Sequence, residues 1–113
     1  MTQIRSTKFG EITIGKKTYY SDVVVWWNGK VDLKTKKHIL TIDDFIGIFE
    51  KNPEIIVIGT GQEGGIKIAP EVEEVASDKK IKIFVETTPK AADIFNAFVK
   101  TGKKVVAIMH TTC

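Results

Sequence analysis

Two side chains near the end of the chain, His110 and Cys113, are the candidates for a catalytic base and a nucleophile. A cysteine attacks as its thiolate, and a nearby imidazole can accept the thiol proton or stabilise the thiolate. Catalytic histidines are usually oriented by a third polar group, yet no Asp, Asn or Glu stands near His110 in the sequence. Two interpretations therefore stay open: a reactive thiol site, or a structural segment that packs against a sheet edge.

Two further groups of small and polar residues each follow an apolar segment that we expect to be a strand. They are residues 59–65, which are rich in glycine, and residues 86–88. In open α/β sheets, ligands bind beyond the carboxyl ends of the parallel strands. We therefore expect a ligand-binding rim next to residues 110–113. Its candidate residues are Gly59, Thr60, Gly61, Thr87 and Thr88.

The glycines of residues 59–65 fit the letters of a dinucleotide-binding fingerprint. That fingerprint needs a helix to begin inside the motif, so that the helix N-terminus faces the pyrophosphate. Here five residues, 65–69, intervene before a helix can start at Pro70. No Gly-Lys pair is followed by Ser or Thr, so a Walker loop is also absent. The pattern favours a tight structural loop, with anion binding by its amides as the alternative.

Length and composition restrict the class of protein. The 113 residues fit one domain, residues 1–113. One cysteine cannot form an internal disulfide, which favours the cytoplasm, and two histidines with one cysteine are too few for a Cys/His zinc site. We expect no metal and no cofactor. The start of the chain has no apolar stretch to serve as a signal, and the longest apolar run is far shorter than the about 20 residues of a membrane helix. We therefore expect no membrane partner.

The positive charge of the chain is concentrated in one segment. The formal net charge is +3, and residues 30–38 contain four lysines and one aspartate, so the remaining residues sum to zero. A general nucleic-acid binder would spread positive charge over one face of the molecule. The pattern therefore favours a solvated loop, and we expect no nucleic-acid partner.

Two adjacent tryptophans, Trp26 and Trp27, stand before an Asn28-Gly29 pair. Adjacent residues on a strand face opposite sides of a sheet, so both indoles cannot enter one core. An exposed indole beside a lysine-rich loop would be a suitable anchor for a protein partner. The alternative is that neighbouring elements cover both rings.

Hydrophobic periodicity predicts the elements that must position these groups. Alternation and β-branched residues indicate antiparallel strands at residues 9–14, 18–27 and 30–33, with Asn28-Gly29 as a type I′ turn. The spacing of Ile42, Phe45, Ile46 and Phe49 predicts a helix after a Thr41 cap with Asp44 at its third position. Strands at 55–58, 81–85 and 105–109 then alternate with helices that begin at Pro70 and at Thr88-Pro89. This alternation predicts an α/β fold with a largely parallel sheet and an N-terminal antiparallel β-meander.

Several short segments together resemble the signature of one small protein family. They are Phe9-Gly10, Tyr20-Ser-Asp22, Ile58-Gly-Thr-Gly61, Thr88 with Ala92, Phe95-Asn96 and Val99, Gly102-Lys-Lys-Val-Val106, and the final His110-Thr-Thr-Cys113. Members of the family include the adipogenesis-associated domain protein and a mitochondrial complex I assembly factor. The resemblance implies a single three-layer α/β domain with a mixed central sheet. It implies no activity and no catalytic residue, and the assembly and regulatory roles of these members suit a binding protein.

We therefore predict a non-enzymatic cytoplasmic binding module, similar to an assembly factor, for a protein partner or for a small-molecule ligand at the rim. The alternative is a thiol-dependent enzyme or a small-ligand binder, with a nucleotide among the ligands considered. It would use His110, Cys113 and the loop of residues 59–65. A solvent-open Cys113 sulfur within hydrogen-bond reach of His110 would favour the alternative.

Overall fold

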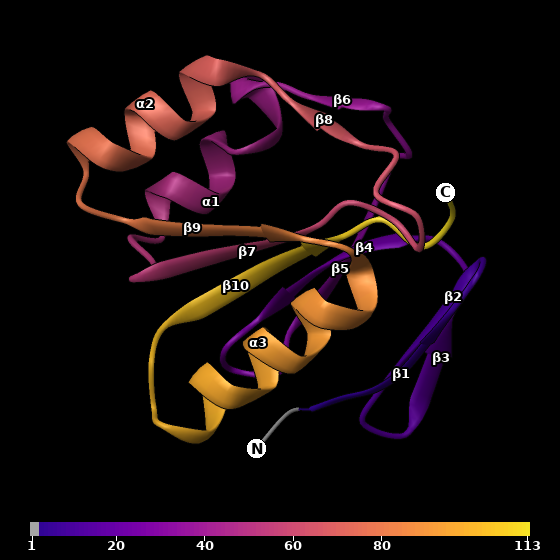
Figure 1. Ribbon diagram of the computed structural model, residues 1–113. Helices are drawn as coiled ribbons and strands as arrows, with labels where there is room; N and C mark the ends of the chain where they lie inside the picture. The colour runs from indigo at the N-terminus through magenta and orange to yellow at the C-terminus, as the bar shows by residue number, and fades with distance from the viewer. Residues whose placement is uncertain (1–2) are drawn as a thin grey trace.

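The computed structural model describes residues 3–113. Its centre is a five-stranded sheet with the order β5-β4-β10-β7-β9 (Figure 1). The bounds are Asp22–Trp26 for β4, Val31–Lys34 for β5, Ile55–Gly59 for β7, Lys82–Glu86 for β9 and Val105–Met109 for β10. Strands β9, β7 and β10 run parallel, β4 is antiparallel to β10, and β5 is antiparallel to β4. The predicted mixed, largely parallel sheet is confirmed.

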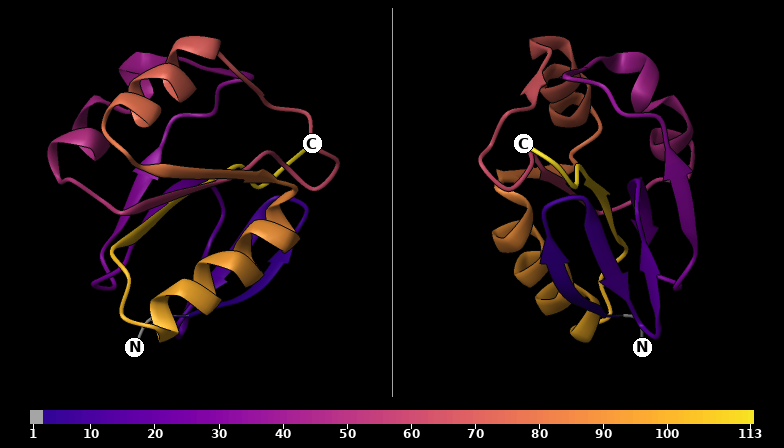
Figure 2. Two further views of the ribbon diagram at one scale, coloured as in Figure 1. Left: turned by 60° about the vertical axis from the view of Figure 1, so that its left-hand side comes forward. Right: turned by 90° about the vertical axis from the view of Figure 1, so that its right-hand side faces the viewer.

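Helices and smaller sheets cover both faces of the central sheet, which gives the expected three layers (Figures 1 and 2). One face carries the 3-10 helix η1 (Ile42–Asp44), α1 (Ile46–Glu50), α2 (Pro70–Asp78) and the short parallel pair β6 (Ile39–Leu40) and β8 (Lys67–Ile68). The other face carries α3 (Thr88–Lys100) and an antiparallel sheet of β1 (Ile4–Lys8), β2 (Glu11–Ile14) and β3 (Lys17–Tyr19). No helix within residues 3–113 is long and apolar enough to cross a membrane.

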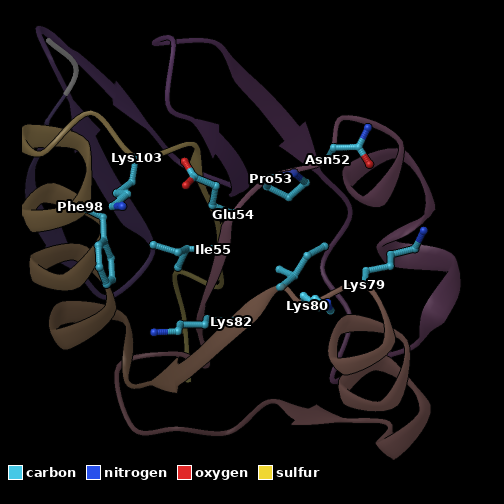
Figure 3. A pocket seen from close by; sticks show the side chains of 10 residues that line it. Asn52, Pro53, Glu54, Ile55, Lys79, Lys80, Lys82, Phe98 and Lys103 are labelled. Atoms are coloured by element: carbon cyan, nitrogen blue, oxygen red, sulfur yellow. The ribbon is translucent and has the colours of Figure 1, made fainter.

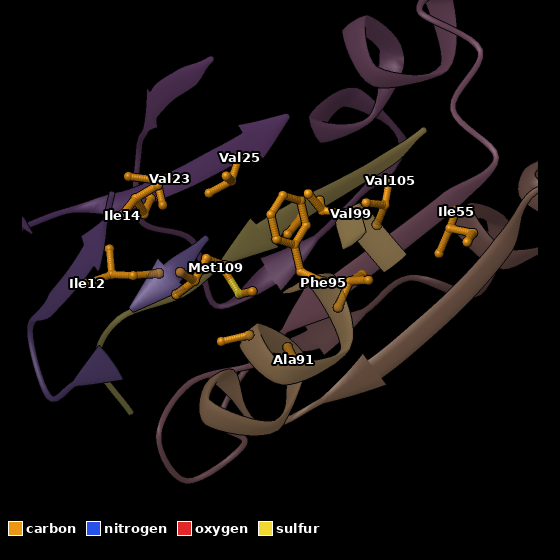
Figure 4. Packing of buried hydrophobic residues seen from close by; sticks show 14 residues of the cluster. Ile12, Ile14, Val23, Val25, Ile55, Ala91, Phe95, Val99, Val105 and Met109 are labelled. Atoms are coloured by element: carbon orange, nitrogen blue, oxygen red, sulfur yellow. The ribbon is translucent and has the colours of Figure 1, made fainter. Parts of the chain in front are cut away.

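The two central strands separate two hydrophobic clusters. Every residue of β7 and β10 is buried, because both strands are covered on both faces. Val57, Val105 and Ala107 belong to the same cluster as Phe95 of α3, and Figure 4 shows Val105 and Phe95 within it. Ile56 belongs to the cluster beneath α1 and α2. This alternation fixes the register of the strands, since a shift of one residue would exchange the two faces.

The N-terminal meander differs from the prediction in where its strands begin and end. Phe9 and Gly10 form the turn of a β1–β2 hairpin, with Gly10 at φ +82°, instead of opening a strand. β1 was not predicted because it is mostly polar, and Ile4 is its one buried residue. The predicted long strand 18–27 is interrupted at Tyr20 and Ser21, where the chain passes from the small sheet into the central one.

The hairpin between β4 and β5 is not the predicted type I′ turn. The Lys30 carbonyl accepts a hydrogen bond from the Trp26 amide at 2.9 Å, which leaves a loop of three residues. Only Gly29 in this loop has a positive φ, +94°, and its amide donates to Trp26 O. This is the pattern of a three-residue loop that ends in a G1 bulge, which needs one left-handed residue rather than two.

The helix predicted from residue 42 onward is divided into η1 and a five-residue α1. The expected capping box is confirmed: Asp44 Oδ2 accepts a hydrogen bond from the Thr41 amide at 2.8 Å. Helix α3 begins at Thr88, with Thr87 at the N-cap, one residue before the predicted cap. Strand β10 has the predicted bounds.

Candidate functional site

Three loops meet at the carboxyl ends of β7, β9 and β10, where Figure 1 shows the C-terminus beside the segment that follows β7. The Thr60 amide and hydroxyl both donate to the Glu86 carbonyl, at 2.9 and 3.0 Å. The His110 amide donates to the Gly59 carbonyl at 3.0 Å. The three segments considered from sequence therefore lie together at one rim.

Thr88 connects all three loops. Its side chain is fully buried, and its Oγ1 accepts a hydrogen bond from the Gly61 amide at 2.9 Å and donates to the His110 carbonyl at 2.6 Å. A Cβ on Gly59 would lie 2.6 Å from Met109 Sδ and 2.9 Å from Thr88 Oγ1, closer than such atoms approach. Gly59 therefore allows the strand end and the helix start to pack together. Thr87 lies beside them, partly exposed.

His110 is buried, with 3% of its surface exposed, and both of its ring nitrogens have partners. Nδ1 lies 2.7 Å from Asp22 Oδ2, and Nε2 lies 3.1 Å from Thr112 Oγ1. The other carboxylate oxygen of Asp22 accepts hydrogen bonds from the amide of Thr111 at 3.0 Å and from its hydroxyl at 3.3 Å. One buried acid thus orients the imidazole and holds the backbone that follows it.

Asp22 is the site residue that the reasoning on His110 missed, because 88 residues separate the two in the chain. The sequence contained a signal for it. Asp22 directly precedes the apolar run Val23-Val-Val. A carboxylate at the start of a buried strand needs a hydrogen-bond or ionic partner. It also belongs to one of the segments that carry the family resemblance.

The glycine loop encloses the last residues of the structure. The Gln62 amide donates to the Thr112 carbonyl at 2.7 Å, and the Gly65 amide donates to the Cys113 carbonyl at 2.8 Å. A Cβ on Gly61 would collide with the Cys113 carbonyl. These loop amides, which could otherwise bind an anion, are thus occupied by the chain itself.

Cys113 is exposed, and within residues 3–113 its thiol makes no hydrogen bond with His110. The imidazole is instead engaged by Asp22 and Thr112, below the surface. His38 approaches the same imidazole with its ring centroid 6.3 Å away. A carboxylate, an imidazole and a hydroxyl are therefore aligned, but the ring between them is not open to a substrate.

The tryptophan pair lies away from this rim, at the β4–β5 hairpin. Trp26 packs against the cluster under α1 and α2, and Trp27 packs against the cluster on the α3 face, as expected for adjacent strand residues. Both are partly buried, and their ring centroids are 5.8 Å apart. Trp26 Nε1 donates to Asp32 Oδ2 at 2.8 Å. A partner surface at Trp26 and Trp27 stays a prediction.

The lysine-rich segment 30–38 is attached to the fold through Asp44. Lys34 Nζ and Lys37 Nζ lie 3.0 and 2.8 Å from its two carboxylate oxygens. Burial opposes ionisation, but hydrogen bonds from Lys37, the Thr41 amide and Lys34 outweigh it and lower the pKa of Asp44 to about 2. Part of the positive charge is therefore held in ion pairs with a largely covered carboxylate, and the Lys34 side chain is only 11% exposed, so this part of the segment is not the solvated loop that the sequence predicts.

Comparisons with known proteins identify a family and several structures of similar fold. Residues 4–110 match the model of a family described as "Protein of unknown function (DUF498/DUF598)". The chain is similar in structure to a protein named MT938, with 24% identity, a TM-score of 0.85 and 100% of both chains covered. It is similar to a conserved hypothetical protein from Pyrococcus horikoshii, with 21% identity and a TM-score of 0.88 over 98% of this chain and 99% of that one. A Mth938-like domain from Bordetella pertussis has 14% identity and a TM-score of 0.63, over 97% and 85% of the two chains.

Proposed function

This chain belongs to the DUF498/DUF598 family of proteins of unknown function, and we propose that it acts as a non-enzymatic cytosolic module that binds a protein partner at the rim. One observation carries the proposal: large apolar side chains stand exposed around a rim whose polar groups are bonded to one another. Phe9 is 68% exposed, Tyr20 is 75% exposed and Ile39 is 56% exposed. Exposed apolar groups that gather in one place mark interaction surfaces.

Each of these residues is joined to the C-terminal segment through a near neighbour in the chain. Phe9 precedes Gly10, whose amide donates to the Thr111 carbonyl at 2.8 Å. Tyr20 stands two residues before Asp22, which holds His110 and Thr111. Ile39 follows His38, the ring that packs edge-on against His110. Three segments distant in sequence therefore place these residues near the C-terminal segment.

The polar groups of the rim support binding rather than chemistry. Thr88, Asp22 and His110 are buried and have internal partners, so they hold the rim in one shape. Rigid aromatic side chains around a fixed polar centre are typical of protein contact surfaces. The resemblance to assembly and regulatory proteins points in the same direction.

A comparative capture experiment tests this proposal. The wild-type protein and a Phe9→Ser/Tyr20→Ser double variant are immobilised, and proteins retained from the native extract are quantified by mass spectrometry. Ile46→Ser on α1 is the matched control, because Ile46 is also an exposed apolar residue, at 51%. We expect a partner retained by the wild type and by Ile46→Ser and lost from the double variant. Equal retention by all three proteins, or no selective partner, would contradict the proposal. Sedimentation of the purified proteins shows whether the partner is a second copy of this chain.

A further inference from the structure

The end of the sheet opposite the rim contains a pocket of about 470 Å³, shown in Figure 3. It lies at the amino ends of β7 and β9 and beside the loop that precedes β10. Its apolar lining consists of Pro53, Ile55, Ile81 and Phe98. Its polar lining consists of Asn52, Glu54, Lys79, Lys80, Lys82 and Lys103.

The backbone holds the walls of this pocket together without any ligand. The Glu54 amide donates to the Lys104 carbonyl at 2.8 Å, and the Lys82 amide donates to the Glu54 carbonyl at 3.2 Å. The Glu54 side chain accepts a hydrogen bond from the Lys104 amide at 2.9 Å. The single acid of the lining is therefore used to join two loops.

Within residues 3–113, none of the four lining lysines forms an ion pair. Lys79 extends toward α1, with its Nζ 5.9 Å from the Phe49 ring centroid, whereas Lys82 and Lys103 extend toward the Phe98 side of the pocket (Figure 3). Lys80, Lys82 and Lys103 with Glu54 give the rest of the lining a formal charge of +2. The three lysines are exposed and have no counter-ion within residues 3–113, so their ammonium groups are available to an anion.

A structural interpretation of these lysines is that they offset the negative C-terminal ends of the nearby helices. α2 ends at Asp78 and α3 ends at Lys100, next to the pocket. Each helix end contributes only about half a negative charge. Two such ends therefore leave about half of the +2 uncompensated. Lys82 and Lys103 also lie outside the helices, on β9 and on the loop before β10.

Lys80 adds a second argument, because its backbone is in the left-handed region with φ +60°. It follows the end of α2, where its amide donates to Ser77 O and the next amide donates to Ala76 O. Glycine is the residue that this helix-ending turn favours. A lysine at this position keeps an ammonium group at the pocket at a conformational cost.

We propose that this lysine pocket binds a small organic phosphate, with Lys80, Lys82 and Lys103 contacting the phosphate and Phe98 contacting the apolar part. Lysine ammonium groups bind phosphate as compact point charges, and the volume falls in the range of small-ligand sites. Phe98 supplies a ring surface on one side of the pocket, where a flat apolar group can pack. This site is separate from the partner surface proposed at the rim.

Calorimetric titration of the full chain with AMP and with inorganic phosphate tests the proposal. We expect saturable binding of AMP, weaker binding of inorganic phosphate, and AMP affinity at least about tenfold lower in Lys82→Gln/Lys103→Gln. The matched control is Lys8→Gln/Lys16→Gln, which removes the same charge at exposed positions of the small antiparallel sheet and its turns. Its affinity should stay within about twofold of the wild type, because those lysines do not line the pocket.

A third variant separates binding from folding. Lys80→Gly should weaken AMP binding while leaving the thermal midpoint equal or higher, because glycine suits the turn. Three results would overturn the proposal: no saturable binding of AMP, an equal loss of affinity in the Lys8/Lys16 control, or full affinity in the Lys82/Lys103 and Lys80 variants. Equal affinities for AMP and inorganic phosphate would overturn its organic part.

Discussion

Asp22 has a larger structural role than any other single acid at the rim, because one buried carboxylate serves both His110 and Thr111. Removing it would leave an imidazole nitrogen and a backbone amide buried without a partner. Such groups cost roughly 1–3 kcal/mol each. The C-terminal segment should then separate from β4 before the rest of the domain unfolds.

Asp22→Ala should therefore lower the free energy of unfolding by about 3 kcal/mol, measured by urea denaturation. Asp93→Ala is the matched control, since Asp93 is exposed on α3, and its effect should stay within about 0.5 kcal/mol. A loss below about 1 kcal/mol in Asp22→Ala would show that solvent or other groups replace the carboxylate.

Cys113 should behave as an ordinary accessible thiol. Its side chain is exposed and makes no hydrogen bond with His110 in the described part of the chain. Alkylation by iodoacetamide in the folded protein should proceed within about twofold of the rate in urea-unfolded protein. Asp22→Asn should leave the folded rate unchanged. A folded rate tenfold above the unfolded one would instead favour the thiol-enzyme alternative.

The convergence of the three loops could be predicted from the sequence, but the hydrogen bonds between them could not. Glycines and threonines after apolar strands identified the right loops, because parallel strands place their carboxyl ends at one edge. The sequence indicated that Asp22 needs a partner, but it could not indicate that this partner is His110. Asp22 joins it only because β4 lies antiparallel to β10, and strand order cannot be derived from hydrophobic periodicity.

At the scale of elements, the buried strands were the easiest to predict. β7 and β10 are short β-branched runs, which is what a strand covered on both faces requires. β1 is polar because most of it faces solvent, so it has no such pattern. Two residues, Tyr20 and Ser21, divide a continuous β-favouring segment between two sheets, and only tertiary packing determines that break.

The capping box of η1 makes the stability of this element depend on pH. The pKa of Asp44 is lowered from 3.8 to about 2, so its ionised form is stabilised by folding. That contribution is fully present above about pH 4 and is lost as the pH falls toward 2. The difference in unfolding free energy between wild type and Asp44→Asn should be about 1 kcal/mol at neutral pH, after allowance for solvent screening at Lys37. Urea unfolding between pH 2 and 7 measures it, and a difference independent of pH would contradict the assignment.

The turn after α2 allows a stabilising substitution. Lys80→Gly relieves a left-handed backbone conformation and should raise the free energy of unfolding by about 0.5–1 kcal/mol. Lys79→Gly, one residue earlier with φ −88°, should lower it by a similar amount because no such strain exists there. Thermal unfolding followed by circular dichroism distinguishes the two signs. A destabilised Lys80→Gly would mean that the lysine side chain contributes more than the backbone costs.

At the scale of the whole molecule, charged residues that are far apart in the sequence lie together in the fold. Outside residues 30–38 the chain is neutral in sum, but the fold gathers four lysines around one pocket while the acids Glu73, Glu74 and Asp78 line a separate surface of α2. Summing charge along the sequence therefore did not reveal this local excess of lysines. The expectation of no nucleic-acid partner rested on that sum and stays a prediction.

The position of β10 has a consequence for how the protein is made. It is the last strand in chain order, yet it lies at the centre of the sheet and pairs with both β4 and β7. While a ribosome has released only the chain through β9, the two halves of the sheet have no strand between them. The central sheet can therefore close only after β10 has been synthesised, and until then the strand edges of β4 and β7 that pair with β10 are open to non-native pairing.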